Sequence, residues 1–253
     1  MKLAALSLVL PCALAFLPPP ASFVRPASQT ALPARVSVFF GTVTGTTQEA
    51  ANMIIDELFV QGVDCHPEAV CVDDILGSLA PAFAAHDTII CGAPSYHNMR
   101  GVADAEQTGT SWDNVLNHDL LCNNECNLDD DAVKRVLRGK RIACFGSGDQ
   151  VNYPEDFCNA VGELHSVFSS LGAYMFGSMP LDGYSFSKSA AVKESRANRG
   201  GRNMESCGLL LDNESQPDLT YARVKAWVKK LVRDGFFAAP DGEQPPGLAS
   251  AGA

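Results

Sequence analysis

The stretch that decides the fold is Val36–Thr47, with the sequence VSVFFGTVTGTT. Its first five residues, Val36–Phe40, are apolar, β-branched or aromatic, and they predict a buried strand. The strand runs directly into a loop of Gly and Thr whose far end opens a helix. Such a junction favours an anion, because the first backbone N–H groups of a helix lack intrahelical partners and the helix dipole attracts negative charge.

The composition of this loop favours a phosphate. Gly41 and Gly45 allow the backbone to approach a ligand closely, and four threonines supply hydroxyl donors. The loop has no Lys, which excludes the GxxxxGK[ST] loop of nucleoside-triphosphate sites, and it has no GxGxxG for a dinucleotide. A terminal monophosphate held by neutral donors is the remaining candidate. For this loop taken alone, an ordinary Gly- and Thr-rich turn is the alternative.

Strand and helix patterns alternate along the rest of the chain, which predicts an α/β fold with a doubly wound parallel sheet and helices on both faces. We expect five strands, at residues 36–40, 63–72, 88–91, 141–145 and a last strand in two pieces, 173–178 and 207–211. We expect helices over residues 46–61, from 73 to 79, from Ser111, from Pro154 to Leu171, and from Asp218 onward with Tyr221, Val224, Val228 and Leu231 facing inward.

Three Gly-containing loops follow the first, third and fourth expected strands. They are the 41–47 loop, Gly92–His97 (GAPSYH) and Gly146–Gln150 (GSGDQ). In open parallel sheets, ligands bind outside the carboxyl ends of the strands, where the strand order reverses. Three such loops on one edge favour a ligand site there.

Charge and composition limit the class of partner. The chain has 253 residues, 46% hydrophobic and 19% charged, which suits one globular domain with additional segments. Three of the 19 basic residues and none of the 29 acidic residues lie in the first 35, so the remainder carries 16 basic against 29 acidic groups. This acidity argues against nucleic acid and for a basic protein partner, with plain solubility as the alternative.

The two ends differ in composition from the middle. Residues 1–15 have the pattern of a secretory signal peptide, which is too short for a membrane span. Residues 16–35 are rich in Pro, Ser and Arg and resemble a plastid transit peptide, so that residues 1–35 resemble the bipartite presequence of algae with secondary red plastids. We expect the protein to work in the plastid stroma, whose reducing conditions suit the nine cysteines. The Pro-, Gly- and Ala-rich residues 237–253 predict a disordered tail.

Two clusters of suggestive side chains receive no functional assignment. Cys122 and Cys126, with His118 upstream, have loose spacing and no second pair follows them, so we expect no metal site. The basic side chains between the pieces of the last strand predict a solvated loop more than a docking site. They are Lys188, Lys193, Arg196, Arg199 and Arg202.

Six motifs together resemble the long-chain flavodoxins over residues 36–236. They are TVTGTT (42–47), APSY (93–96), GTSWDN (109–114), FGSGDQ (145–150) with Tyr153 three residues on, DGYSF (182–186) and LDNESQPDLTYARVKAWV (211–228). The loop that interrupts the last strand marks the long-chain form, and GTSWD resembles plastid flavodoxins of red-lineage algae. The resemblance implies a flavodoxin-like FMN-binding domain with strand order 2-1-3-4-5.

The function that the resemblance implies is electron transfer and not enzymatic catalysis. The protein would be a low-potential one-electron carrier with non-covalent FMN, replacing ferredoxin between photosystem I and ferredoxin–NADP reductase when iron is limiting. We expect a monomer with basic redox partners, no nucleic acid and no membrane span. The alternatives are an FMN-dependent NAD(P)H:quinone reductase on the same fold and a flavodoxin-like interaction module without flavin.

The resemblance also implies which residues bind the cofactor. The 42–47 loop would hold the FMN phosphate, Tyr96 and Tyr153 would cover the two faces of the flavin ring, and the 147–149 backbone would meet its pyrimidine edge. The implied cofactor-binding residues are Thr42, Val43, Thr44, Gly45, Thr46, Thr47, Pro94, Ser95, Tyr96, His97, Ser147, Gly148, Asp149, Tyr153 and Asp156. No residue is implied as a catalytic acid, base or nucleophile.

Overall fold

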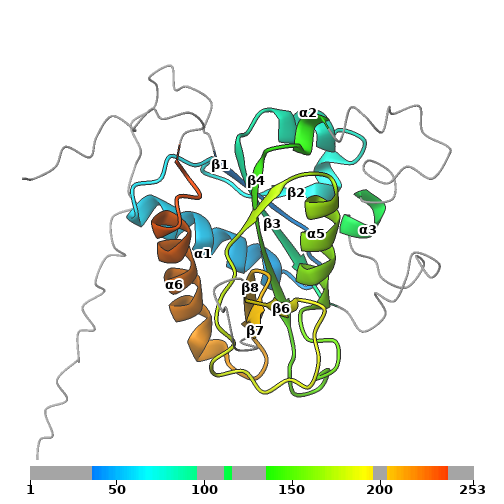
Figure 1. Ribbon diagram of the computed structural model, residues 1–253, viewed down its shortest axis with the longest axis vertical. Coiled ribbons are helices and arrows are strands. Elements are labelled where there is room, and N and C mark those ends of the chain that lie inside the picture. Colours follow the sequence, from blue (N-terminus) through cyan, green and yellow to red (C-terminus); the bar gives the residue numbers. More distant parts are fainter. Residues whose placement is uncertain (1–35, 96–110, 116–134, 196–203, 239–253) are drawn as a thin grey trace, which may run out of the picture. The chain divides into compact units, whose positions relative to one another are not determined.

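The protein is described by a computed structural model over residues 36–95, 111–115, 135–195 and 204–238 (Figure 1). The main sheet contains β1 (Val36–Phe40), β2 (Val70–Cys71), β3 (Thr88–Pro94), β4 (Arg141–Gly148), β5 (Tyr174–Phe176) and β8 (Leu209–Asp212). A separate antiparallel pair consists of β6 (Val192–Glu194) and β7 (Met204–Ser206). The helices are α1 (Thr46–Val60), α2 (Leu79–Ala84), α3 (Ser111–Val115), α5 (Asn159–Ser170) and α6 (Thr220–Arg233), with short 3₁₀ turns η1 (Val72–Ile75) and η3 (Pro217–Leu219).

The main sheet is parallel and has the order β2-β1-β3-β4-β5, which confirms the predicted fold and strand order. The predicted split of the last strand is also confirmed. β5 pairs with residues 141–143 of β4, and β8 pairs with residues 145–148 on the same strand. The two pieces therefore occupy successive lengths of one neighbour, and the 177–208 segment is inserted between them.

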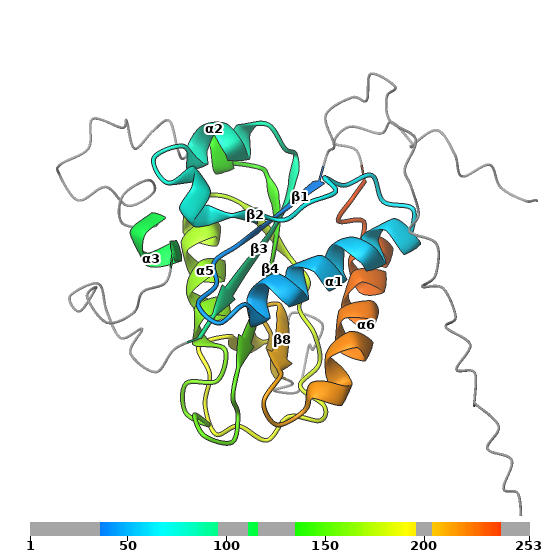
Figure 2. The ribbon, with the colours of Figure 1, turned by 180° about the vertical axis from the view of Figure 1, so that it is seen from behind.

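Helices cover both faces of the sheet (Figures 1 and 2). Side chains of α1 and α6 form one buried cluster with Val36, Val38 and Phe40, while α2, α3 and α5 form the other with Phe39. Alternate residues of β1 thus face opposite layers, as the pleat of a strand requires. All seven residues of β3 are buried, which explains why the central strands read as continuous apolar runs.

The second strand is shorter than the predicted 63–72. Cys65 makes one isolated bridge to Val36, and regular pairing begins again only at Val70. Pro67 lies between these points and has no N–H to donate, so the ladder is interrupted at this edge strand.

Two helices begin later than predicted. The predicted helix over 73–79 is replaced by the 3₁₀ turn η1 at Val72–Ile75, and α2 starts only at Leu79, because Gly77 adopts φ +78° and separates the two. Similarly α5 starts at Asn159 and not at Pro154, since residues 150–158 form successive turns. The apolar face predicted for α5 is nevertheless buried, including Phe157 just before it.

The inward face of α6 differs from the prediction at one position. Val224, Val228 and Leu231 are buried as predicted, but Tyr221 is 55% exposed. Trp227 fills the core instead, because it lies three residues from Val224 and four from Leu231 on the same side of the helix.

The folded chain continues slightly beyond the boundary predicted at residue 236. Phe236 is fully buried against Phe176, and Phe237 packs on the same cluster. The Arg141 guanidinium donates hydrogen bonds to the carbonyl oxygens of Phe236 and Ala238. The start of β4 thereby holds the chain that follows α6.

Several sequence-based predictions lie outside the described residues. These are the 1–35 presequence, the tail beyond Ala238, the cluster of His118, Cys122 and Cys126, and the arginines at 196, 199 and 202. Within the stretches that the structure describes, no helix is long and apolar enough to cross a membrane.

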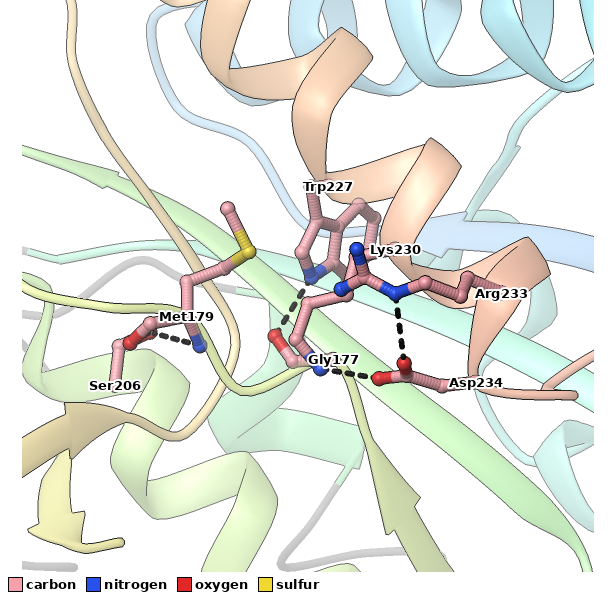
Figure 3. A network of polar contacts seen from close by, with 7 residues as sticks. All are labelled: Gly177, Met179, Ser206, Trp227, Lys230, Arg233 and Asp234. Carbon is pink, nitrogen blue, oxygen red and sulfur yellow. Dashed lines mark hydrogen bonds and ion pairs between the residues drawn. The ribbon is translucent and has the colours of Figure 1, made fainter. Parts of the chain in front are cut away.

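The inserted segment is fastened to α6 where it leaves β5 (Figure 3). Trp227 Nε1 donates to the Gly177 carbonyl oxygen at 2.8 Å. Gly177 has φ +89°, and a Cβ there would lie 2.7 Å from that ring nitrogen, so only glycine fits. Two residues after Gly177, the Met179 carbonyl accepts a hydrogen bond from the backbone N–H of Ser206 at 2.8 Å. The Met179 N–H in turn donates to the Ser206 hydroxyl at 3.2 Å. Both ends of the insertion are thus tied together.

Trp227→Phe tests this junction. The variant keeps an aromatic ring in the core but leaves the Gly177 carbonyl without its donor, so we expect unfolding free energy to fall by about 1–3 kcal/mol. Urea unfolding of the apoprotein measures the change. Tyr221→Phe, on the exposed side of the same helix, is the control, and equal stability of the two variants would contradict the assignment.

Glu163→Gln tests how α5 and α3 meet. Burial and the negative charge of Asp113 raise the pKa of the Glu163 carboxyl from 4.5 to about 7. The folded state therefore binds this proton more tightly than the unfolded state, and stability falls as the pH rises between those two values. We expect Glu163→Gln to be more stable than the parent at about pH 8 and similar at about pH 4. Urea unfolding at both pH values measures this, and a pH-independent difference would contradict it.

Candidate functional site

The carboxyl ends of four parallel strands lie side by side at one edge of the sheet. In register, Phe40 pairs with Gly92, Pro94 with Ser147, and Gly148 with Asp212. The ladder continues into the loops, since Gly41 N–H donates to the Gly92 carbonyl and Ser95 N–H donates to the Ser147 carbonyl, both at 2.9 Å. The three loops predicted to share an edge therefore emerge next to one another.

The loop after β1 forms a concave turn at the start of α1. Gly45 adopts φ +93°, and its N–H donates to Thr42 Oγ1 at 3.0 Å. The hydroxyls of Thr44 and Thr46 lie 3.3 Å apart. Because Gly45 occupies the N-cap position and has no side chain to cap the helix, the first N–H groups of α1 are available to a ligand.

Two buried hydroxyls at this edge have no hydrogen-bond partner among the described residues. One is Thr47 Oγ1 in the first turn of α1, and the other is Ser147 Oγ near the end of β4. A buried hydroxyl without a partner costs about 1–3 kcal/mol, so such groups are rare unless a ligand completes them. No Lys, Arg or His occurs between residues 36 and 62, and any anion here is held by neutral groups of this segment.

The loop after β4 is closed by its own acidic side chain. The Asp149 carboxylate accepts hydrogen bonds from Val151 N–H at 3.0 Å, Asn152 N–H at 2.9 Å and the Asn152 amide at 2.6 Å. Slight burial would raise the pKa of the Asp149 carboxyl, but the bonds from Asn152 and Val151 outweigh it and lower that pKa. A Cβ on Gly148 would lie 2.9 Å from Cys158 N, so the backbone passes closely there. With its side chain occupied, Asp149 has its backbone to offer a ligand.

Tyr153 and Asp156 follow on the same loop. Tyr153 N–H donates to the Asp149 carbonyl at 3.0 Å, and the Tyr153 side chain is 46% exposed. Asp156 Oδ1 accepts from the Asn159 amide at 3.0 Å, at the start of α5. Tyr153 is thus an exposed aromatic side chain on the loop at the ligand edge, and a ring contact for it and for Asp156 stays a prediction.

The loop after β3 is described only at its beginning. Pro94 ends the strand, and Ser95 Oγ accepts from Ala160 N–H at 3.0 Å, which supplies a cap for α5 from a different part of the chain. Within the same strand, the Gly92 carbonyl oxygen accepts a hydrogen bond from Trp112 Nε1 at 2.7 Å. Tyr96 and His97 lie outside the described residues, so the second ring contact is a prediction that the structure does not address.

Sequence reasoning assigned no role to two buried polar residues behind this edge, Gln150 and Asp212. Gln150 is 3% exposed, Asp212 is fully buried, and Gln150 Nε2 donates to Asp212 Oδ2 at 2.7 Å. The available signal was their position within quoted motifs, because Gln150 ends the loop after the fourth predicted strand (GDQ) and Asp212 directly follows the last predicted strand (LDN).

Thiol chemistry and metal binding are two further possibilities for the described residues. Burial raises the pKa of the thiols of Cys91, Cys144 and Cys158, so these cysteines are protonated and unreactive at neutral pH. No group of three or more potential metal ligands occurs within the part of the chain that the structure describes.

Comparison with known proteins identifies relatives of this arrangement. The family model described as Flavodoxin matches residues 38–227. The flavodoxin of Synechococcus elongatus is 33% identical over 198 residues, which cover 78% of this chain and 96% of the relative. The flavodoxin of Trichodesmium erythraeum is 32% identical over 197 residues, covering 78% and 95%. The solved structure of Fusobacterium nucleatum flavodoxin bound to flavin mononucleotide has a TM-score of 0.56 at 22% identity, covering 79% of this chain and 97% of that one.

Thr47→Val tests the anion site. The change removes a hydroxyl that has no partner among the described residues, so apoprotein stability should stay equal or rise by up to about 1 kcal/mol. Affinity for a phosphate-bearing ligand should fall by about tenfold. Urea unfolding and ligand titration measure the two effects.

Thr220→Val is the matched control for that test. The Thr220 hydroxyl donates to Asn213 Oδ1 at 2.7 Å, so its removal should lower stability by about 1 kcal/mol and leave phosphate-ligand affinity unchanged. A loss of apoprotein stability in Thr47→Val with no loss of affinity would contradict the site.

Proposed function

The chain belongs to the flavodoxin family of FMN-containing electron-transfer proteins, and from this membership we propose that it is a low-potential one-electron carrier that stands in for ferredoxin. The observation that carries the proposal is the uncapped start of α1, with the hydroxyl of Thr47 beside it, which has no hydrogen-bond partner within the described stretches. It offers amides and hydroxyls without a cation, which is the donor set that a terminal phosphate monoester needs.

The edge residues fit FMN in type and position. Thr42–Thr47 would hold its phosphate, and the backbone of 147–149 would meet the pyrimidine edge of the ring, with the Ser147 hydroxyl as a further donor. Tyr153 would cover one ring face and Tyr96 the other. Two aromatic planes exclude water from a ring between them and add about 0.5–1.5 kcal/mol per contact beyond area burial.

When bound, FMN supplies the one-electron chemistry, and this chain's residues set its environment. Exposed carboxylates follow the carboxyl edge on three loops, at Glu155, Asp182, Glu214 and Asp218, and the stretches 149–158, 181–187 and 212–219 contain no Lys or Arg. Negative surroundings disfavour added negative charge, which lowers the reduction potential. The same carboxylates favour a basic partner that approaches this edge.

For the physiological partners we propose photosystem I as the electron donor and ferredoxin–NADP reductase as the acceptor, under iron limitation. The support is the acidic edge together with the first 35 residues, whose pattern resembles a signal and transit peptide for a secondary red plastid. The relatives named above are matched over 95–96% of their own length by 78% of this chain, so this chain carries additional residues that they lack. We propose the plastid stroma as the compartment.

The test is reconstitution of the 36–253 protein with FMN, followed by electron transfer from illuminated photosystem I to ferredoxin–NADP reductase, measured as NADPH formation. Holoprotein should support NADPH formation in place of ferredoxin. A protein that takes up no FMN would contradict the proposal. Rapid oxidation of NADPH by the holoprotein without a reductase would indicate the alternative, a quinone reductase.

Thr44→Asp is the matched variant for this test. Thr44 is exposed, so the fold should tolerate the change, but a carboxylate would stand where the phosphate binds. Repulsion between the two anions should weaken FMN binding by at least about tenfold. Fluorescence titration with FMN measures it, and unchanged affinity would refute the phosphate site.

A further inference from the structure

Asp212 is a buried carboxylate that lies next to the loop after β4. It ends β8, is fully buried, and pairs in register with Gly148. Among the residues that the structure describes, the only other fully buried carboxylate is that of Glu57 in α1, away from this edge. A buried charge is costly unless hydrogen bonds compensate it. The donors that bond to Asp212 therefore show which segments of the chain it connects.

The two oxygens of Asp212 hold two different segments. Oδ2 accepts from Gln150 Nε2 at 2.7 Å and from Gln150 N–H at 3.4 Å, and Oδ1 accepts from Ser215 N–H at 2.8 Å. The sheet ladder of β4 ends at Gly148. Beyond that residue the Asp149 carboxylate makes hydrogen bonds within the loop itself, and Asp212 supplies the bonds that join Gln150 to the end of β8.

Gln150 extends the connection to the inserted segment. Its Oε1 accepts from Ser185 N–H at 2.7 Å, while its Nε2 is bound to Asp212. The neighbouring Tyr184 hydroxyl donates to the Leu210 carbonyl at 2.5 Å. One carboxylate and one amide thus join the loop after β4, the insertion and the turn after β8.

Arg223 supplies positive charge on the outer side of this network. Its Nη2 donates to Gln216 Oε1 at 2.6 Å, and its guanidinium lies 4.0 Å from the centre of the Tyr184 ring. Gln216 N–H in turn donates to the Asp212 carbonyl at 3.1 Å. Arg223 therefore reaches the Asp212 segment through Gln216 and leaves both carboxylate oxygens to Gln150 and Ser215.

We propose that Asp212 is a positioning residue for the flavin ring, which acts through Gln150 to hold the 147–150 loop in its binding shape before the cofactor arrives. This inference rests on the proposed function. A loop ordered in advance loses little conformational freedom on binding, which increases affinity without any contact between Asp212 and the ligand. Because the loop meets the ring and not the phosphate, Asp212 contributes equally to the binding of FMN and of riboflavin, which lacks the phosphate.

Asp212→Asn is the discriminating variant. Asn carries no charge and places an NH₂ donor where Asp has its second acceptor oxygen, so it cannot accept from both Gln150 and Ser215, and any bond that it keeps is weaker than the bond to a carboxylate. We expect dissociation constants for FMN and riboflavin to rise by the same factor, about tenfold, with the ratio between them unchanged. Thr47→Val changes that ratio, because it affects only the ligand with a phosphate.

Gln150→Ala removes the same connection from the other side and carries the test if Asp212→Asn does not fold. Its loss of affinity should match that of Asp212→Asn, and the double variant should lose little more than either single variant, because the two residues act through one bond. Asp64→Asn, an exposed acid between α1 and β2, is the control and should bind both ligands as the parent does.

Fluorescence titrations of the folded apoproteins, checked by circular dichroism, separate the outcomes. Parental affinity for both flavins in Asp212→Asn or Gln150→Ala overturns the inference and leaves the proposed function intact. A loss confined to FMN also overturns it, because the effect would then belong to the phosphate site. If the parent protein takes up neither flavin, the proposed function fails and this inference fails with it.

Discussion

The structure depends on which strands pair with the two edges of β4. One edge pairs with β3 over Arg141–Gly148, and the other edge pairs first with β5 and then with β8. Parallel strands cannot be joined by a tight turn, so each of these pairings requires a crossover. Because β3, β4 and β8 end at neighbouring positions, their loops open at the same edge. The candidate site is the direct result of this register.

The site combines an open helix start with a layer of supporting bonds. The donors that the 42–47 loop offers are amides and hydroxyls, and the carboxylates of Asp149 and Asp212 hold the loop after β4 in shape. A phosphate held by neutral dipoles leaves the net charge of the site negative. That balance agrees with the proposal of a carrier that works at low potential and meets a basic partner.

The sequence predicted the sheet well because its strands are buried on both faces and stand out as apolar runs between Gly-rich loops. It failed where local patterns competed with tertiary contacts. Pro154 favoured a helix start, but α5 begins at Asn159, where Ser95 from another loop supplies the cap. Tyr221 fits the apolar period of α6, yet Trp227 takes the core position because its N–H reaches Gly177. Neither partner is visible in the local sequence.

The candidate site was predictable to a similar extent and for similar reasons. The Gly and Thr loop after β1 carries its chemistry in the sequence itself. The roles of Gln150 and Asp212 are visible only after folding, since 62 residues separate them along the chain. Their side chains meet because β8 returns to β4 after the insertion.

The hydrogen bonds from Arg141 hold the last described residues of the chain at the amino edge of the sheet. Val36 starts β1, and Ala238 is held by the first residue of β4, so both attachment points lie at the amino edge of the sheet, opposite the ligand edge. A linker attached at Val36 or at Ala238, to an electrode surface, a resin or a second redox protein, would therefore start from the side away from the loops at the ligand edge. Immobilisation at these two positions would leave the proposed cofactor edge facing the solution.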